Sequence, residues 1–239
     1  MPRKPAQPLP DWEKVLHAAA YLQRILPGAV LVGGSASAIH ARHRVSRDAD
    51  HALADLNERF DAVLSQLESA AGWKTSRVQR PVQILGSLDG ILTGVRQLIR
   101  RKPLETQTIK WRGYAITLPT LAEMLRIKAV LILKRNATRD YLDFVAMCEK
   151  LGDTASADAL RPLDRLYPQP NGESPLQQLV IQLSYPLPYD LEETRLSEYK
   201  RLVPQWHDWD TVKRACARCA TSLFDRLAAG TRRAGRKRR

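Results

Sequence analysis

The chain has 239 residues and a mass of 27.0 kDa, enough for one elaborated domain or two small ones. Hydrophobic residues make up 44% and charged residues 26%, a composition typical of a soluble globular protein that excludes fibres and disorder throughout. Apolar runs are far shorter than the roughly 18 residues that cross a bilayer, and the N-terminus lacks the apolar segment of a secretory signal. We therefore expect a cytoplasmic protein without a membrane partner.

The net charge is strongly positive, because the chain has 38 Lys and Arg residues but only 25 Asp and Glu residues, which gives +13. Six of the basic residues lie in the last eight positions, RRAGRKRR. We expect residues 231–239 to form a disordered basic tail that is attracted to phosphates, with a solubilising tail as the alternative. The remaining +7 on the body favours a polyanionic partner.

Three cysteines are present, an odd number that argues against a disulfide framework. Cys216 and Cys219 have the spacing of metal ligands, but no second pair exists in the sequence. A zinc site is therefore not expected there.

Residues 1–118 have a mixed pattern. Asp11 is a predicted N-cap for a helix over 11–26, and an apolar strand over 29–32 then runs into Gly33-Gly34. The pattern then predicts a helix over 35–42, a strand over 48–53, a helix from Asp55 that closes at Gly72, a strand over 81–85, and a hairpin of 107–111 with 114–118. Together these elements predict the α+β class.

Residues 119–230 have a helical pattern. Thr120 and Glu123 form a predicted capping box at the start of a helix of about 14 residues. Further helices are predicted over 138–151, 154–166, 174–183, 190–202 and 208–228. We therefore expect a mixed domain over 1–118, a helical region over 119–230 and the tail.

The stretch LVGGSASAIHARHRVSRDAD, residues 31–50, carries the most chemical information. A strand delivers Gly33, Gly34 and Ser35 into a turn at a helix start, where free backbone N–H groups can accept a phosphate. On the following strand, Asp48 and Asp50 point to the same side about 7 Å apart. Such a pair can hold divalent cations and bridge them to nucleotide phosphates.

Two blocks of this sequence resemble the AbiEii/AbiGii-type toxins of the DNA polymerase β-like nucleotidyltransferase superfamily. The first is Gly33-Gly34-Ser35 followed by Arg44-x-Ser46-x-Asp48-x-Asp50. The second is LPTLAEMLRIKAVLILKRNATRDYLDF, residues 118–144, which resembles that family's lysine helix and its Arg-Asp-x-x-Asp helix. The resemblance covers about residues 30–150 and implies a polymerase β-like domain followed by helices.

The resemblance implies Mg²⁺-dependent transfer of an NMP from an NTP to an acceptor hydroxyl, on a tRNA 3′ end or a protein, and implies a cognate antitoxin. It assigns one or two Mg²⁺ ions to Asp48 and Asp50. It assigns nucleotide contacts to Gly33, Gly34, Ser35, Arg44, Ser46 and Arg139, and catalytic parts to Lys128 and Asp140. Arg139 could instead pair with Asp143, and His40 and His43 could touch the substrate.

The third carboxylate of such a site is open, because the predicted strand 81–85 has Gln83 where the family has an acid. Asp140 and Asp89 are the candidates. Asp89 lies in a stretch with Gly86, Gly90 and Gly94 that predicts a loop close to a ligand or to neighbouring backbone, or a plain turn. If neither completes the site, the chain is a nucleic-acid-binding module without chemistry. A further alternative is a nucleotidyltransferase of antibiotics.

Overall fold

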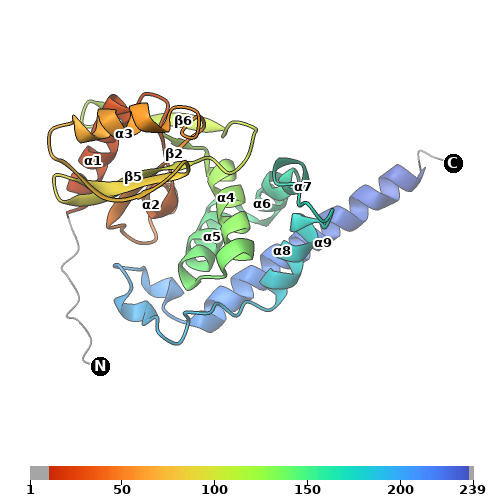
Figure 1. The fold of residues 1–239 in the computed structure, drawn as a ribbon. Helices are drawn as coiled ribbons and strands as arrows, with labels where there is room; N and C mark the ends of the chain where they lie inside the picture. The colour runs from red at the N-terminus through yellow and green to blue at the C-terminus, as the bar shows by residue number, and fades with distance from the viewer. Residues whose placement is uncertain (1–10, 237–239) are drawn as a thin grey trace. The chain divides into compact units, whose positions relative to one another are not determined.

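A computed structural model of the chain describes residues 11–236, with side chains up to residue 228 (Figure 1). The chain divides into two compact units. The sheet unit comprises the described residues up to Ala36, Val45–Arg101 and Gln107–Leu118. The helical unit comprises Ser37–Arg44, Lys102–Thr106 and the described residues from Pro119 onward.

The sheet unit contains two sheets. The first has five strands in the order β1-β2-β5-β4-β3, with β2 and β5 parallel and the other pairs antiparallel. The second is the predicted hairpin of β6 and β7, which is confirmed. The elements of this unit are α1 (Trp12–Ile25), β1 (Val30–Leu31), the start of α2 (Gly33–Ala41), β2 (Asp48–Leu53), α3 (Phe60–Glu68), β3 (Trp73–Gln79), β4 (Gln83–Leu88), β5 (Ile91–Gln97), β6 (Thr106–Trp111) and β7 (Tyr114–Pro119). The remainder of α2, from Ser37 onward, belongs to the helical unit.

The apolar faces of α1 and α3 cover one face of the five-stranded sheet (Figure 1). The stripe of α1 buries Val15, Ala19 and Leu22, and the side chains of β2 alternate between half-buried and buried. Ala49, His51 and Leu53 therefore point into this core, whereas Asp48 and Asp50 point to the opposite face. The Asp11 side chain caps α1 as predicted, accepting from the Glu13 N–H at 3.1 Å.

Three elements of the sheet unit differ from the prediction. Of the alternatives for residues 86–94, the structure has a plain turn at Asp89 and Gly90, which joins β4 to the unpredicted strand β5. Strand β3 was not predicted either, because after Trp73 its residues are exposed and lack the alternation of a half-buried strand. Helix α3 begins at Phe60 rather than near Asp55. The Asp55 carboxylate accepts from Arg59 Nε at 2.7 Å, so it does not cap a helix.

The helical unit packs α4, α5, α6, α8 and α9 against one another, with α8 beside α9 (Figure 1). Its core includes Leu125, Phe144, Leu179 and Leu223. The predicted capping box at Thr120 is confirmed, since the Thr120 hydroxyl accepts from the Glu123 N–H at 3.2 Å. The elements are α4 (Leu121–Arg135), α5 (Thr138–Leu151), α6 (Asp153–Leu160), α7 (Leu163–Leu166), α8 (Pro175–Ser184), η1 (Leu196–Glu198), η2 (Pro204–Trp206) and α9 (Trp209–Arg236).

Three predictions for the helical unit need correction. The helix expected over 154–166 is split between α6 and α7 by Pro162, whose ring nitrogen has no hydrogen to donate. Residues 190–202 contain only the short η1, and Lys200 and Arg201 adopt positive φ angles that no helix contains. Helix α9 continues to Arg236 and so enters the expected tail, of which residues 237–239 lie outside the described residues. The predicted α+β class with a helical C-terminal region is confirmed.

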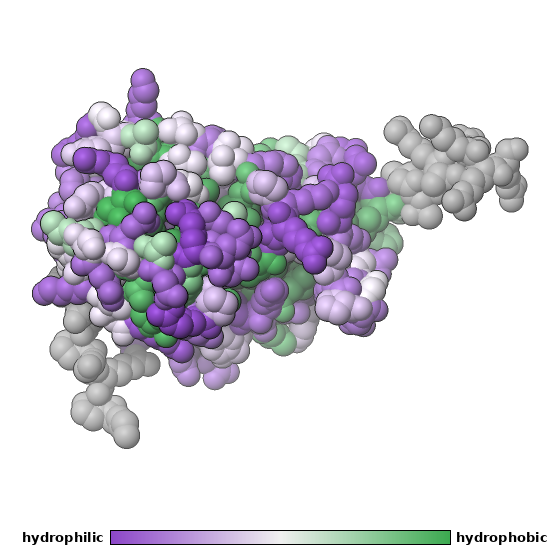
Figure 2. Space-filling model, turned by 45° about the horizontal axis from the view of Figure 1, so that its top comes forward, coloured by the Kyte–Doolittle hydropathy of each residue, from purple (hydrophilic) through white to green (hydrophobic). Residues whose placement is uncertain are grey.

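Hydrophilic residues cover most of the face seen in Figure 2, and hydrophobic residues appear there as separate patches. Over residues 11–236 no helix is both long and apolar enough to cross a membrane.

Candidate active site

The Gly33-Gly34-Ser35 turn lies against the strand that carries the two aspartates. The Val32 N–H donates to the Asp50 carbonyl at 2.8 Å, which continues the β1–β2 pairing up to the turn. Gly33 has φ +67°, and a Cβ added there would lie 3.5 Å from Asp50 Oδ2. The turn therefore exposes main chain, rather than a side chain, beside the Asp50 carboxylate.

Ser35 and Ser46 both donate hydrogen bonds to Asp48, one to its main chain and one to its side chain. The fully buried Ser35 hydroxyl donates to the Asp48 carbonyl at 2.5 Å, so its proton is committed to the main chain. The Ser46 hydroxyl donates to Asp48 Oδ1 at 2.7 Å and orients that carboxylate. A phosphate contact by Ser35 stays a prediction, and the backbone N–H groups at the start of α2 are the donors best suited to it.

Strand register defines what surrounds the two aspartates on their face of the sheet. Asp48 pairs with Leu92, Asp50 with Gly94, and Ala52 with Arg96. Paired residues share a face, so β5 contributes no acid to this face, and Gly94 leaves the position beside Asp50 without a side chain.

Neither Gln83 nor Asp89 supplies a third carboxylate beside the pair. Gln83 is buried, and its amide oxygen accepts from Arg96 Nη2 at 3.0 Å. Asp89 lies in the turn between β4 and β5, where its N–H donates to Gly72 at 3.0 Å and its carboxylate lies beside the Gly72 Cα.

The donor set of the pair suits Mg²⁺. Asp48 and Asp50 are hard oxygen ligands at adjacent same-face positions of one strand, and both are half-buried. Among the described residues, no group of three or more His, Cys, Asp and Glu side chains lies close enough to hold a metal. Proteins usually bind Mg²⁺ through one or two carboxylates, and substrate phosphates and water complete its coordination shell.

The second block of the resemblance lies in the helical unit and forms a buried ionic network. Lys128 Nζ lies 2.7 Å from Asp143 and 3.1 Å from Asp140, and all three side chains are at most 1% exposed. Arg135 binds Asp140 through two nitrogens, with Nη2 at 2.8 Å. Arg44 donates hydrogen bonds to Asp143 from Nε at 2.7 Å and from Nη2 at 2.9 Å.

Asp143 is the centre of this network, since His43 Nε2 also lies 2.8 Å from its carboxylate. Burial alone would raise the pKa of Asp143, but the charges of Arg44 and Lys128 and the contact from His43 outweigh burial and hold the pKa well below its usual range. The carboxylate is therefore ionised. It ties the segment that follows α2 to α4 and α5.

The network contains several of the predicted site residues. Lys128 and Asp140 meet within it, and their predicted catalytic parts stay predictions. Arg139 is exposed, and among the described residues Asp143 pairs with Arg44, His43 and Lys128 instead. His40 Nε2 lies 2.8 Å from the Pro119 carbonyl, and burial lowers its pKa.

The sequence offered Arg139 as a partner of Asp143 only as an alternative to a nucleotide contact, and it did not predict the pairing of Asp143 with His43 and Arg44. These partners lie 99 and 100 residues away along the chain, where helical spacing cannot connect them. A buried acid on an apolar helix face was the available signal, because such an acid requires a cation.

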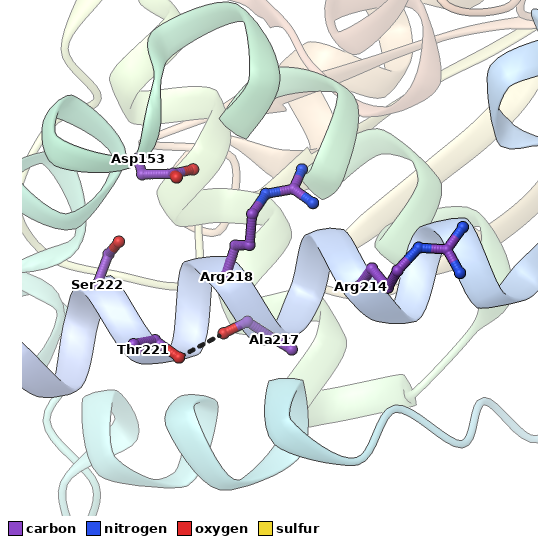
Figure 3. Close-up of a pocket in the computed structure, with 6 residues that line it drawn as sticks. All are labelled: Asp153, Arg214, Ala217, Arg218, Thr221 and Ser222. Carbon is purple, nitrogen blue, oxygen red and sulfur yellow. Dashed lines mark hydrogen bonds between the residues drawn. The ribbon is translucent and has the colours of Figure 1, made fainter.

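A hollow of about 550 Å³ lies elsewhere in the helical unit, along α9 (Figure 3). It is lined by Asp153, Arg214, Ala217, Arg218, Thr221 and Ser222. Figure 3 shows Arg214 and Arg218 extending from the same helix, with Asp153 on the neighbouring segment. No predicted site residue lines this hollow.

Comparisons with known proteins give partial matches. No family model matches the chain. The mycolic acid-containing lipids exporter MmpL11 of Mycolicibacterium smegmatis and the heme uptake protein MmpL11 of Mycobacterium tuberculosis are each 31% identical over 129 residues. These matches cover 53% of this chain but only 13% of those proteins.

Several solved structures show a weak overall likeness to this chain, with TM-scores below 0.5. ANT(2″)-Ia in complex with adenylyl-2″-tobramycin has a TM-score of 0.47 and 13% identity, over 64% of this chain and 96% of that one. JHP933 from Helicobacter pylori has a TM-score of 0.48 and 14% identity, over 95% and 96%. An antigenic nucleotidyltransferase-like protein from Paracoccidioides brasiliensis has a TM-score of 0.46 and 16% identity, over 66% and 90%. Likeness at this level does not assign a function, and membership of the AbiEii group stays a prediction.

Proposed function

We propose that the chain is a Mg²⁺-dependent nucleotidyltransferase that moves an NMP from an NTP to a hydroxyl of an RNA acceptor. The observation that carries this proposal is the placement of Gly33 against Asp50, on a strand whose Asp48 is held by Ser35 and Ser46. A helix start of the kind that can bind phosphate and two hard oxygen ligands meet there, where β1 ends and β2 begins.

In the proposed reaction the acceptor oxygen bonds to the α-phosphorus, and the bond from that phosphorus to the β-phosphate oxygen breaks. Pyrophosphate leaves, and the proton of the hydroxyl passes to a carboxylate or to water. Mg²⁺ held by Asp48 and Asp50 would neutralise the triphosphate and lower the pKa of the attacking hydroxyl. The main chain at the start of α2 would hold the terminal phosphates, and Ser46 would keep the Asp48 carboxylate in place.

For Lys128 and Asp140 we propose an indirect part. Their charges are matched within the network, which leaves Lys128 little free charge to offer a nucleotide. Through Asp143 they anchor Arg44, from which the chain continues through Ser46 into β2. A nucleotide contact by Arg44 is not part of the proposal, because its guanidinium binds Asp143 and its side chain is 2% exposed. A nucleotide contact by Arg139 stays a prediction, and a cognate antitoxin is a further part of the proposal.

A second candidate function is a nucleic-acid-binding module without chemistry. It is favoured by one specific observation, the lack of a third acid beside Asp48 and Asp50 at the described positions Leu92, Gly94 and Arg96. An antibiotic nucleotidyltransferase fits less well, because a cationic substrate would meet the exposed Arg96 near the pair.

The test is incubation of the full chain with Mg²⁺, total tRNA and each α-labelled NTP in turn, beside the double variant Asp48→Asn/Asp50→Asn. We expect label on RNA with the wild type and none with the variant, whose circular dichroism should be unchanged. Label on a polypeptide would move the acceptor to protein. No label in any reaction, or equal label with the variant, would contradict the proposed chemistry.

A further inference from the structure

The positive charge of the chain is distributed unevenly. Residues 1–118 hold 17 basic and 10 acidic residues, whereas residues 119–230 hold 15 of each. The final segment 231–239 adds six basic residues and no acid. The whole charge excess of residues 1–230 therefore lies within residues 1–118.

Within the first 118 residues, the excess gathers around β3, β4 and β5. Residues 73–101 contain six basic residues and one acid, Asp89. Arg80 contacts Asp61, so its charge is matched. Lys74, Arg77 and Arg96 are exposed, and none of them forms an ion pair among the described residues.

Strand register places these three cations on the face that carries the two aspartates. One row across the sheet runs Asp48, Leu92, Ser87, Lys74, and the next runs Asp50, Gly94, Leu85, Arg77. Arg96 stands in a third row beside Ala52. At about 4.8 Å between strands, the Cα atoms of Asp50 and Arg77 are about 14 Å apart.

A bulge in β3 is what brings Arg77 to this face. Lys74 and Arg77 are three residues apart, so in a regular strand they would point to opposite sides. The register shifts between Thr75 and Arg77, and the extra residue returns Arg77 to the side of Lys74.

Protection of a sheet edge accounts for only part of this pattern. Edge strands commonly carry Lys or Arg to prevent pairing with other chains, and β3 is an edge strand. Arg96, however, lies on β5 in the interior of the sheet, and Gln83 holds its guanidinium. Protection of an edge strand does not explain why a cation lies on β5. It also does not explain why the bulge in β3 turns Arg77 to the same face as Lys74.

We infer that this sheet face is the track for the sugar-phosphate backbone of the RNA acceptor, with Lys74, Arg77 and Arg96 contacting its phosphates. The inference rests on the proposed function, because the track is defined by its distance from Asp48 and Asp50. The reacting end lies at the aspartates and the chain of phosphates extends across β5, β4 and β3. Such contacts are electrostatic and independent of base sequence.

The test compares two triple variants of the full chain. Lys74→Gln/Arg77→Gln/Arg96→Gln removes the track, and Lys213→Gln/Arg214→Gln/Arg218→Gln removes one Lys and two Arg from the exposed face of α9. The charge change is the same in both. Affinity for end-labelled total tRNA is measured by filter binding without NTP over a range of salt concentrations, and labelled transfer is measured separately.

We expect the track variant to lose at least about tenfold in tRNA affinity and its log–log salt slope to fall by about 2 to 3. The α9 variant should change the slope by less than about 1. Equal losses in the two variants, a larger loss in the α9 variant, or no tRNA binding by the wild type would overturn the track. Selective loss of binding in a chain that transfers no NMP would support the track while contradicting the proposed chemistry.

Discussion

His51 lies three residues after Asp48 on β2 and faces the opposite side of the sheet. Its imidazole is fully buried among backbone groups of Ala19, Ala49 and Gly94, and neither ring nitrogen makes a hydrogen bond of normal geometry with a described residue. Burial lowers the pKa of His51 to about 4, against an ordinary value of 6.5, and the nearby carbonyls offset only part of this. The ring is therefore neutral in the folded protein at physiological pH.

This buried ring predicts a pH-dependent stability. The unfolded state binds a proton below about pH 6.5 while the folded state resists it until about pH 4, so the free energy of unfolding falls as the pH falls through that window. At about pH 5 the loss amounts to about 2 kcal/mol. Urea unfolding of His51→Leu near pH 7.5 and pH 5 should show a pH dependence smaller by that amount, whereas His17→Leu, at an exposed position, should keep the wild-type dependence. An unchanged dependence in His51→Leu would contradict the prediction.

At the scale of elements, the helical unit depends on the network around Asp143. A buried carboxylate shared by Arg44, His43 and Lys128 joins the end of α2 to α4 and α5. Removing its charge takes the Asp143 counter-charge away from the buried cations Arg44 and Lys128. A broken buried ion pair costs far more than a broken surface pair.

We expect Asp143→Asn to lower the free energy of unfolding by about 3 to 5 kcal/mol, measured by chemical denaturation. The matched control is Asp158→Asn, which breaks the Arg226–Asp158 pair at 2.8 Å between side chains that are 43% and 46% exposed. That change should cost less than about 1 kcal/mol. Similar losses in the two variants would show that the network contributes little.

Local signals predicted the elements with strong caps and periodicity. Asp11 and Thr120 begin helices as expected because each side chain accepts a backbone N–H of the first turn. Strand β5 was not predicted because the glycines of residues 86–94 suggested a loop or a turn. Gly86 and Gly94 approach neighbouring backbone, one of the predicted alternatives, since a Cβ there would lie 2.5 Å from the Lys74 carbonyl and 2.6 Å from the Ile84 carbonyl.

Long-range contacts set the limit of what sequence could indicate about the site. Ser46 and Asp48 are two residues apart, and their relation was readable from one motif. The pairing of Asp50 with Gly94, and of Arg44 with Asp143, joins positions far apart in the chain. Only the sheet register and helix packing bring these residues together, so the lack of an acid beside Asp50 and the partners of Asp143 required the structure.

At the scale of the whole molecule, charge divides the chain into a basic segment over 1–118, a segment over 119–230 with equal numbers of basic and acidic residues, and a basic segment over 231–239. Helix α9 continues to Arg236, so part of that end belongs to a helix. The side chains of residues 229–236 and all of 237–239 lie outside the described residues. A cluster of six basic residues can bind phosphates without sequence preference, in addition to any contacts at the sheet face.

Replacing the six basic residues of 232–239 with Gln should therefore weaken tRNA binding and lower the log–log salt slope by about 4 to 5 if all six contact phosphates. Filter binding over a salt series measures this change. The cluster would raise the association rate and the affinity for tRNA without taking part in the chemical step. We therefore expect kcat at saturating tRNA to stay unchanged while the KM for tRNA rises. A slope equal to that of the wild type would show that these residues make no phosphate contacts. A fall in kcat with an unchanged KM would instead assign the end of the chain to the reaction itself.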